Sequence, residues 1–391
     1  MSAQDYKAPA GLDRVQMRGW LVGGVALVIA VIGAFAYPDK FFQSYLFSYL
    51  LVLGLTMGSL GLLMLQHLTG GQWGIMIRRP LEAASRNVPL ILVMFLPIVL
   101  FGMKRLYSAW LNPTEPLSAY QQRYLTHGGF VFRAVVYFAI WLLLMVLFNS
   151  WSRQQDLEPE NPVVLRRIKA LAGPGVILYV LSMTFAVIDW AMSLSPHWAS
   201  TIYGFIFVAT QAVSAMCLMI LVVILLKGSE PYASVLKTRH LHDLGKLLFA
   251  FNMLWGYFDF SQLLIIWSGN QPEEISFYRS RLTGEWGVVA VVVLLFSFGL
   301  PFLILLSQDV KRDPKLISKV AIWMLVFRLV DLYWMTRPEF TARAWPTWLD
   351  FVVPIALVGV WVGFFAMNLK QRPILPLGDP NLAEAIAQHE H

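Results

Sequence analysis

The sequence carries little charge and has a single cysteine. Charged residues make up 14% of its 391 residues, whereas a soluble chain carries about 25%. Because Cys217 has no partner cysteine, an internal disulfide, a Cys-x-x-Cys metal site and a Cys-x-x-Cys-His haem attachment are excluded. Any electron carrier that works with this chain is therefore bound non-covalently or belongs to another subunit.

Apolar residues take the place of the missing charge, at 58% of the chain. A run of about 20 apolar residues crosses a membrane as a helix, because a helix satisfies its own backbone groups in lipid. We therefore predict an all-α integral membrane protein of about ten transmembrane helices. The predicted helices lie at Trp20–Tyr37, Phe42–Leu68, Val88–Met103, Phe130–Ser150, Ala172–Leu194, Thr201–Leu226, Leu244–Ser268, Trp286–Ser307, Ile317–Met335 and Trp348–Leu369.

The polar loops are too short to form a separate soluble domain. We predict a cytoplasmic N-terminal segment over residues 1–19, a transmembrane domain over 20–369 and a cytoplasmic tail over 370–391. The tail is polar and contains proline, so we expect it to lie on a partner or to be mobile. The leader and the first apolar run are both long for a signal peptide, which predicts an uncleaved anchor.

Lysine and arginine divide unevenly between the two sides of the predicted membrane. With the N-terminus in the cytoplasm, twenty of the 30 lie inside, eight lie outside, and Arg133 and Arg328 fall within helices. Cytoplasmic loops carry such an excess. We therefore predict a multi-pass protein of a bacterial inner (plasma) membrane with both termini cytoplasmic, and we ascribe the net charge of +7 to these loops rather than to nucleic-acid binding.

A short similarity between two parts of the sequence suggests an internal repeat. The predicted fifth helix ends in Val187-Ile188-Asp189-Trp190, and the ninth ends in Leu329-Val330-Asp331-Leu332-Tyr333-Trp334. We interpret helices two to five and six to nine as two four-helix bundles of related design, flanked by the first and the last helix. Repeats of this kind are common in membrane proteins.

Charged side chains at membrane depth are the first candidates for a functional site, because each is costly in lipid. Arg133 and Asp189 lie at similar depth on consecutive predicted helices and are close enough to pair. The pair is either a buried salt bridge between two helices or a protonatable carboxylate tuned by an arginine. Arg328 and Asp331, three residues apart on one helix face, are open to the same two interpretations.

Asp259 has no basic residue within one turn of its helix. It must be protonated, face water or pair with another helix, and Arg328 is one candidate partner. Tyr257 and Gln262 are expected to extend a polar stripe along the same helix. Polar stripes also hold helices together, but the aspartate within this one favours a proton path.

No two histidines lie at one depth where a membrane b-type haem would need them, and no metal site is predicted. His127 and His197 lie at the outer edge. His127 is either a simple interfacial histidine or a group that exchanges protons near Arg133. The glycine-rich loop over residues 68–74 lacks the Gly-Lys-Ser/Thr ending of a phosphate loop, and we expect the Arg78-Arg79 pair after it to lie at the level of the lipid headgroups.

Three stretches resemble one protein family. The first is Leu65-Gln66-His67-Leu68-Thr69-Gly70-Gly71-Gln72-Trp73-Gly74 with Arg79 and Glu82, the second is Asp189-Trp190-Ala191-Met192-Ser193-Leu194-Ser195-Pro196-His197-Trp198, and the third is His242-Asp243-Leu244-Gly245-Lys246-Leu247-Leu248-Phe249-Ala250-Phe251, which continues to Pro272-Glu273-Glu274. They are similar to the smaller of the two polysulfide-reductase-type (NrfD-like) membrane subunits of alternative complex III, a bacterial quinol:cytochrome c or quinol:oxidase oxidoreductase.

The resemblance implies a cofactor-free subunit of a respiratory complex in the lipid bilayer. Its partners would be a larger sister subunit of the same NrfD-like fold, the haem c and iron–sulfur subunits, and in some assemblies a terminal oxidase. Whether quinol, as menaquinol or ubiquinol, binds this subunit is left open. No catalytic residue is implied. The candidates for a proton conduit or a quinone site are Asp189, Asp259, Arg328, Asp331, Arg133, His127, His197, Gln262 and Tyr257.

Two other functions compete with this one. A secondary transporter would also have about ten helices and carboxylates near the midplane, but its helices would be broken by Gly or Pro at matching positions of the two halves. Pro97, Pro301 and Pro354 do not match in this way. A scaffold that only anchors other subunits would not need Asp189, Asp259 or Asp331 at membrane depth.

Overall fold

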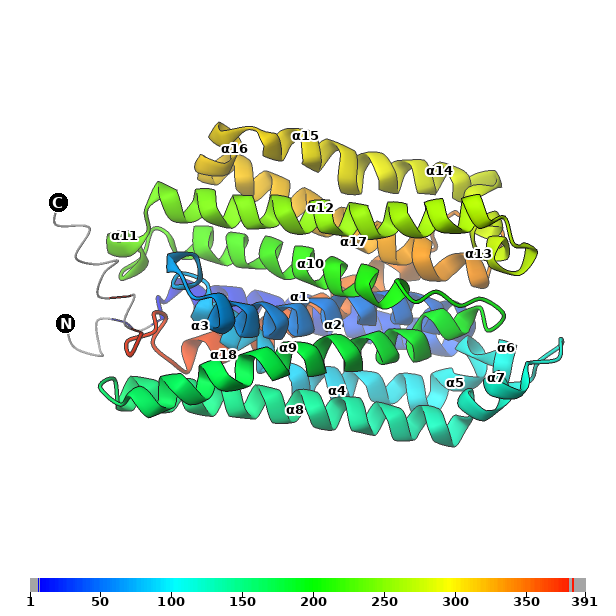
Figure 1. Ribbon diagram of the computed structural model, residues 1–391, viewed down its shortest axis with the longest axis horizontal. Helices are drawn as coiled ribbons and strands as arrows, with labels where there is room; N and C mark the ends of the chain where they lie inside the picture. The colour runs from blue at the N-terminus through cyan, green and yellow to red at the C-terminus, as the bar shows by residue number, and fades with distance from the viewer. Residues whose placement is uncertain (1–5, 7, 380–381, 383–391) are drawn as a thin grey trace.

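The computed structural model describes residues 6, 8–379 and 382, and within these it is built of helices without strands. The long helices run side by side along the longest axis of the molecule (Figure 1). The fold is that of an all-α integral membrane protein. In this described part of the chain, eight spans are long and apolar enough to cross a membrane. They are α1 (Gly11–Ala36), α2 (Pro38–Thr69), Arg78–Leu106 with α3 (Arg78–Ser85), α4 (Val88–Pro97) and α5 (Met103–Leu106), α8 (His127–Leu157), Pro162–Leu194 with α9 (Pro162–Trp190) and η4 (Met192–Leu194), α10 (Tyr203–Leu226), Gly284–Leu306 with α14 (Gly284–Val293) and α15 (Leu300–Leu306), and α18 (Leu349–Lys370).

Two further predicted helices are present but are less apolar. They are α12 (Thr238–Gly269, 32 residues) and α17 (Pro314–Thr336, 23 residues). At 1.5 Å per residue they measure about 48 Å and about 35 Å, and either length exceeds a hydrocarbon core of about 30 Å. Both helices lie among the others in Figure 1. The number of ten membrane spans stays a prediction, and the lengths of α12 and α17 count in its favour.

Several helices begin earlier than the sequence predicts. The first helix starts at Gly11 and not at Trp20, α9 starts at Pro162 and not at Ala172, and α12 starts at Thr238 and not at Leu244. Hydropathy registers only the apolar part of a helix, whereas the polar turns before it are helical too. At α9 the side chain of Asn161 accepts a hydrogen bond from the backbone N–H of Val163, as a helix cap does.

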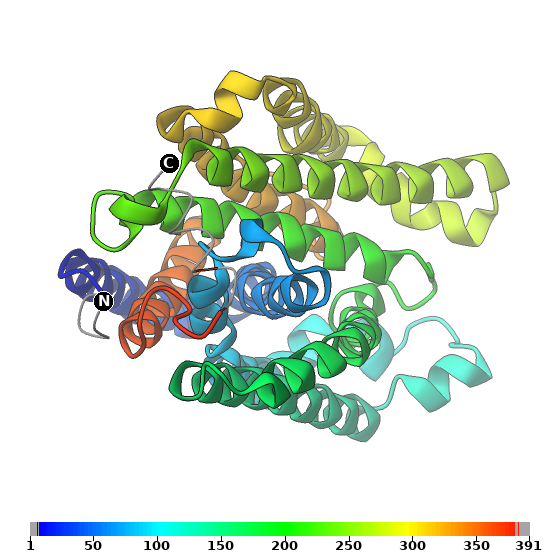
Figure 2. The same cartoon turned by 60° about the vertical axis from the view of Figure 1, so that its left-hand side comes forward.

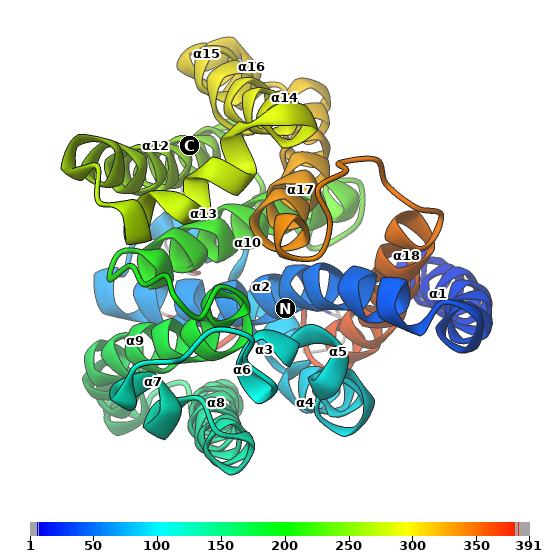
Figure 3. The same ribbon diagram turned by 90° about the vertical axis from the view of Figure 1, so that its right-hand side faces the viewer.

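The helices form two groups of four with a pair at the side (Figure 3). The first group consists of α2, the α4–α5 rod (α4, Val88–Pro97; η3, Ile98–Gly102; α5, Met103–Leu106), α8 and α9. The second consists of α10, α12, α17 and the α14–α15 rod (α14, Gly284–Val293; η5, Leu294–Gly299; α15, Leu300–Leu306). The groups meet where α2 packs on α10, and α1 and α18 flank α2. This arrangement agrees with the expected two bundles and flanking helices.

The flanking pair packs closely because small residues face each other. A Cβ atom on Gly23 would lie 2.4 Å from the backbone nitrogen of Val360, and one on Gly19 would lie 2.9 Å from that of Gly363. Glycines at such positions let two helix backbones approach in lipid. Helix α1 is therefore held mainly by α18, while much of its remaining surface is exposed.

The start of α1 and the end of α18 reach the same end of the molecule (Figure 2), which we call the terminal end; the other is the far end. The C-terminal tail packs against this end of the molecule. Asp379 pairs with Arg78 at 2.8 Å, and the carbonyl of Gly378 accepts a hydrogen bond from Gln155 at 2.9 Å. The predicted tail over 370–391 thus packs on its own chain as far as Asp379, and residues 380–381 and 383–391 lie outside the described residues.

Candidate functional site

The predicted ion pair of the first group is present. The guanidinium of Arg133 on α8 donates from Nη2 to Asp189 Oδ1 on α9 at 2.7 Å and from Nε to Oδ2 at 2.9 Å. Asp189 is fully buried. The hydroxyl of Tyr137 donates to Oδ2 at 2.7 Å. The sequence prediction does not include Tyr137, although this residue lies one turn after Arg133 and hence on the same helix face.

A second tyrosine, Tyr124, contacts the guanidinium of this ion pair. The ring of Tyr124, in α7 (Ala119–Tyr124), lies 3.8 Å from the guanidinium carbon of Arg133. Its backbone carbonyl accepts a hydrogen bond from Arg133 Nη1 at 3.0 Å. Burial, and then the charge of Asp189, raises the pKa of Tyr124 to about 12, so its hydroxyl stays protonated.

Aromatic rings pack around Trp190, the residue that follows Asp189 in α9. Trp190 packs against Phe95 with ring centroids 4.4 Å apart, against Trp141 at 5.8 Å and against Phe138 at 5.9 Å. The carboxylate thus receives hydrogen bonds from two side chains inside an apolar shell. This is the geometry of a satisfied ion pair that fixes α8 to α9.

The second helix group contains the predicted pair of Arg328 and Asp331. Pro301 bears on one of the hydrogen bonds that Arg328 makes. Arg328 Nη1 lies 3.4 Å from Asp331 Oδ2, and its Nη2 donates to the carbonyl of Ser297 at 3.1 Å. In an α-helix that carbonyl would bond to the N–H of residue 301, but Pro301 has none. Arg328 is fully buried, and its guanidinium carbon lies 3.7 Å from the ring of Trp255.

Asp259 lies on the inward face of α12. The buried residues Asn252, Trp255 and Gln262 are spaced from it by seven, four and three positions, which places all four on one face. Asp259 itself is half-buried, and within the described residues it makes neither a hydrogen bond nor an ion pair. Arg328 and Asp331 are the charged groups whose fields act on it. The expected pairing of Asp259 with Arg328 is therefore absent from the described structure.

Asn252 is the second incompletely bonded polar group on this face. It is fully buried, and neither its amide oxygen nor its amide nitrogen has a hydrogen-bond partner within the described protein. A buried polar group left without partners costs about 1–3 kcal/mol. Together with the half-buried carboxylate of Asp259, it marks a polar stretch suited to water.

Towards the far end the stripe continues through complete hydrogen bonds. Gln262 donates to the hydroxyl of Tyr278 at 2.9 Å and accepts from the hydroxyl of Ser200 at 2.8 Å. Tyr278 lies in α13 (Pro272–Leu282). Burial, and then the charge of Asp259, raises the pKa of Tyr278, so it stays a hydroxyl. Gln262 thus occupies the stripe as predicted, between Asp259 and the far end.

An open cup lies beyond Tyr278 at the far end. It has a volume of about 380 Å³ and is lined in part by Glu115, His197, Ser276, Ser280 and Glu339. His197 lies 3.7 Å from Glu115, and Glu339 pairs at 2.7 Å with the buried Arg281, which also belongs to α13. The predicted placement of His197 at one edge of the membrane domain is consistent with this cup.

Two predicted candidates lie elsewhere. Tyr257 is 64% exposed on the side of α12 that faces away from the bundle. The prediction that it belongs to the polar stripe is wrong, because two residues turn a helix by about 200°, which carries Tyr257 away from Asp259. His127 is exposed, lies at the start of α8 and lines a different cavity, between α1, α2 and the α4–α5 rod.

The arginine pair at the terminal end lies inside the protein. Arg78 and Arg79 are buried, with Glu82 between them. Glu82 is 3.2 Å from Arg78 and 2.6 Å from Arg79, and Arg372 of the tail approaches it to 3.5 Å. Buried charges need such partners, and the tail that supplies some of them is far away in sequence.

No model of a known protein family matches this chain, and no curated protein is found to be similar.

Proposed function

We propose that this chain is a membrane subunit of a respiratory quinol oxidoreductase of the alternative complex III type, in which it conducts protons through the second helix group. The proposal combines the resemblance of three sequence stretches with one structural observation. That observation is Asp259, a carboxylate on the inward face of α12 that has no partner within the described residues. Electron carriers would belong to partner subunits.

The position of Asp259 suits a group that binds and releases protons. An aspartate in an ion pair breaks that pair when it takes up a proton, and Asp189 is paired with Arg133. Asp259 lacks such a partner, and the nearby positive charge of Arg328 is already bonded to Asp331 and Ser297. Its carboxylate is therefore free to change protonation state without breaking an ion pair.

Polar groups extend from Asp259 in both directions along α12. Asn252 lies two turns nearer the terminal end, and Gln262 with Tyr278 leads towards the far end and the cup beside Glu339. By the lysine and arginine count, the far end would face the periplasm. Oxidation of one quinol releases two protons with two electrons, and protons that pass Asp259 would leave through this cup.

The decisive experiment replaces Asp259 in the intact complex. Asp259→Asn keeps the size of the side chain but cannot take up or release a proton, so we expect quinol turnover or proton release per electron to fall by about tenfold or more. Asp259→Glu should restore most of it. Asp309→Asn, at an exposed aspartate of α16 (Gln308–Arg312), is the matched control. Normal turnover and normal proton yield in Asp259→Asn would refute the conduit.

Membership of a redox complex is tested separately by mild purification from the native membrane. The chain should bring haem absorbance and iron–sulfur subunits with it. A chain that purifies alone and moves a solute when reconstituted would instead be a secondary transporter.

The π-helical segments η3 and η5 interrupt the second helix of one group and the third helix of the other. In a transporter with inverted repeats, the helix breaks would lie at corresponding positions of the two halves, and these two segments do not.

A further inference from the structure

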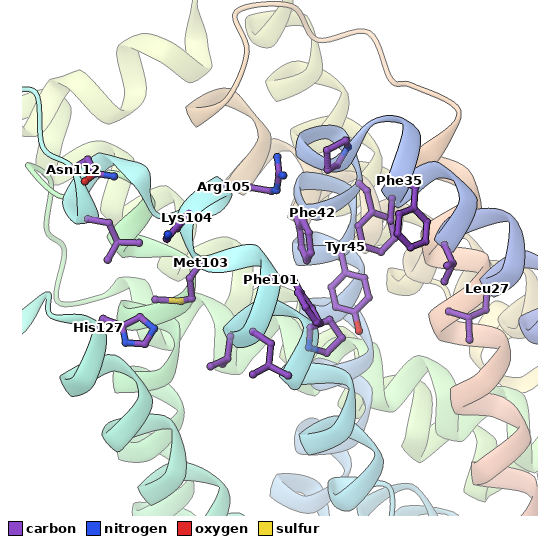
Figure 4. A pocket seen from close by; sticks show the side chains of 18 residues that line it. Leu27, Phe35, Phe42, Tyr45, Phe101, Met103, Lys104, Arg105, Asn112 and His127 are labelled. Atoms are coloured by element: carbon purple, nitrogen blue, oxygen red, sulfur yellow. The ribbon is translucent and has the colours of Figure 1, made fainter.

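A long trough runs between α1, α2 and the α4–α5 rod at the far end (Figure 4). Its volume is about 1030 Å³, and its wall is mostly apolar. Phe35, Leu100 and Phe101 are 86%, 65% and 69% exposed along it. So much apolar surface in one cavity calls for an apolar occupant.

The depth of the trough matches one leaflet of a membrane. Leu27 lines its inner end and lies nine residues before Ala36, where α1 ends. Nine residues of helix span about 14 Å. Half of a hydrocarbon core of about 30 Å is about 15 Å. An acyl chain that enters from the far end would therefore lie along the whole trough.

Positive charge gathers at the mouth. Lys104, Arg105 and His127 line the trough together with Asn112. In Figure 4, Asn112, Lys104 and Arg105 lie towards the loop at the upper edge of the view, and Tyr45 and Phe101 lie below Lys104 and Arg105. Arg105 is paired with Asp39, outside the lining, through Nη1. Lys104 has no ion pair within the described residues, and none of the described residues that line the trough is acidic. The mouth is therefore suited to a negatively charged headgroup.

The interior does not suit a quinone ring, which needs hydrogen-bond donors at its carbonyl oxygens. The deeper lining offers the hydroxyl of Tyr45, and this hydroxyl already donates to the carbonyl of Met94 at 2.7 Å. That carbonyl is available because the N–H of Ile98 bonds to Phe95 instead, next to Pro97. Polar partners are thus found at the mouth, where the headgroup of a membrane lipid would lie.

We propose that the trough binds one anionic phospholipid, with its phosphate at Lys104 and Arg105 and an acyl chain between α1 and the α4–α5 rod. The lipid fills the space that the α4–α5 rod leaves beside α1, which is itself held mainly by α18. This site is separate from the polar stripe of α12, so the lipid proposal does not depend on the proposed proton path.

The test measures lipid retained by the full chain, with any subunits that accompany it, after purification and repeated detergent washing. Mass spectrometry should find about one phosphatidylglycerol or cardiolipin per chain. In Lys104→Gln the retained amount should fall about fivefold and in Lys104→Gln/Arg105→Gln further, since each cation near a lipid surface contributes about 1 kcal/mol. Lys40→Gln, at an exposed lysine of the same end, should retain the lipid.

A second pair of variants tests the trough itself. Val31 lines the trough, so Val31→Trp should displace the acyl chain, whereas Ile32→Trp, on the neighbouring exposed position of α1, should not. The proposal is overturned if the washed protein holds a quinone in place of the phospholipid, if it holds phosphatidylethanolamine equally well, if it holds no lipid, or if Lys104→Gln and Val31→Trp retain as much as their controls.

Discussion

The guanidinium of Arg328 donates a hydrogen bond to the carbonyl oxygen of Ser297 over 3.1 Å and so ties α17 to the π-helical segment η5. In an α-helix this carbonyl would accept from the N–H of residue 301, and Pro301 has no N–H to donate. The same guanidinium carries the charge next to Asp331 and Asp259. One side chain thus pairs with Asp331 and bonds to a carbonyl of the π-helical segment, and it leaves Asp259 without an ion pair within the described residues.

Replacing Arg328 should therefore destabilise the protein strongly. Arg328→Gln leaves Asp331 buried without a counter-charge, and removal of one partner from a buried pair costs about 3–5 kcal/mol. The double variant Arg328→Gln/Asp331→Asn should lose less than the single one, because no uncompensated charge remains. Thermal unfolding in one detergent measures both. Equal losses in the two variants would mean that the charge of Asp331 is not what Arg328 stabilises.

Asp189 should respond differently from Asp259. Asp189→Asn breaks the pair with Arg133 and should lower the unfolding temperature, while Tyr137→Phe removes one hydrogen bond to a charged group, worth about 1.5–3 kcal/mol. Because the carboxylate is bonded to both side chains within an aromatic shell, Tyr137→Phe should leave proton release per electron unchanged. A lower proton yield in Tyr137→Phe would assign this site to the proton path.

Features set by local spacing were predictable from the sequence. The Arg328–Asp331 pair follows from a separation of three residues, and the Arg133–Asp189 pair follows from equal depth on consecutive helices. The polarity of Tyr257 alone predicts the wrong face, because two positions of an α-helix turn it by about 200° from Asp259. The angular position of each residue on the helix separates the two side chains.

Features that depend on distant contacts were not predictable. The burial of Arg78 requires Asp379, 301 residues away, to fold back onto the terminal end. The bond from Arg328 to Ser297 joins helices whose relative rotation no local pattern specifies. The trough at Lys104 likewise depends on a distant contact. Because α1 packs mainly on α18, a space is left between α1 and the α4–α5 rod.

The link between Gln262 and Tyr278 gives a sharper test of the proposed path. Tyr278→Phe removes the hydroxyl that accepts from Gln262 and that neighbours Asp259. We expect slower proton release from the complex at unchanged protein level. The control is Tyr257→Phe, the same substitution on the outward face of α12, where 64% of the residue is exposed. If the two variants released protons at the same rate, the path would not run past Tyr278.

The flanking pair of helices should depend on one glycine much more than on its neighbour. A Cβ on Gly23 would lie 2.4 Å from the nitrogen of Val360, whereas one on Gly24 would meet no other atom within 4 Å. Gly23→Ala must therefore push α1 away from α18, at a cost of about 1–3 kcal/mol for overpacking. Gly24→Ala should be neutral or slightly stabilising, since alanine favours helix more than glycine does. Thermal unfolding of the two variants distinguishes these outcomes, and a tolerant Gly23 would mean that α1 is free to shift on α18.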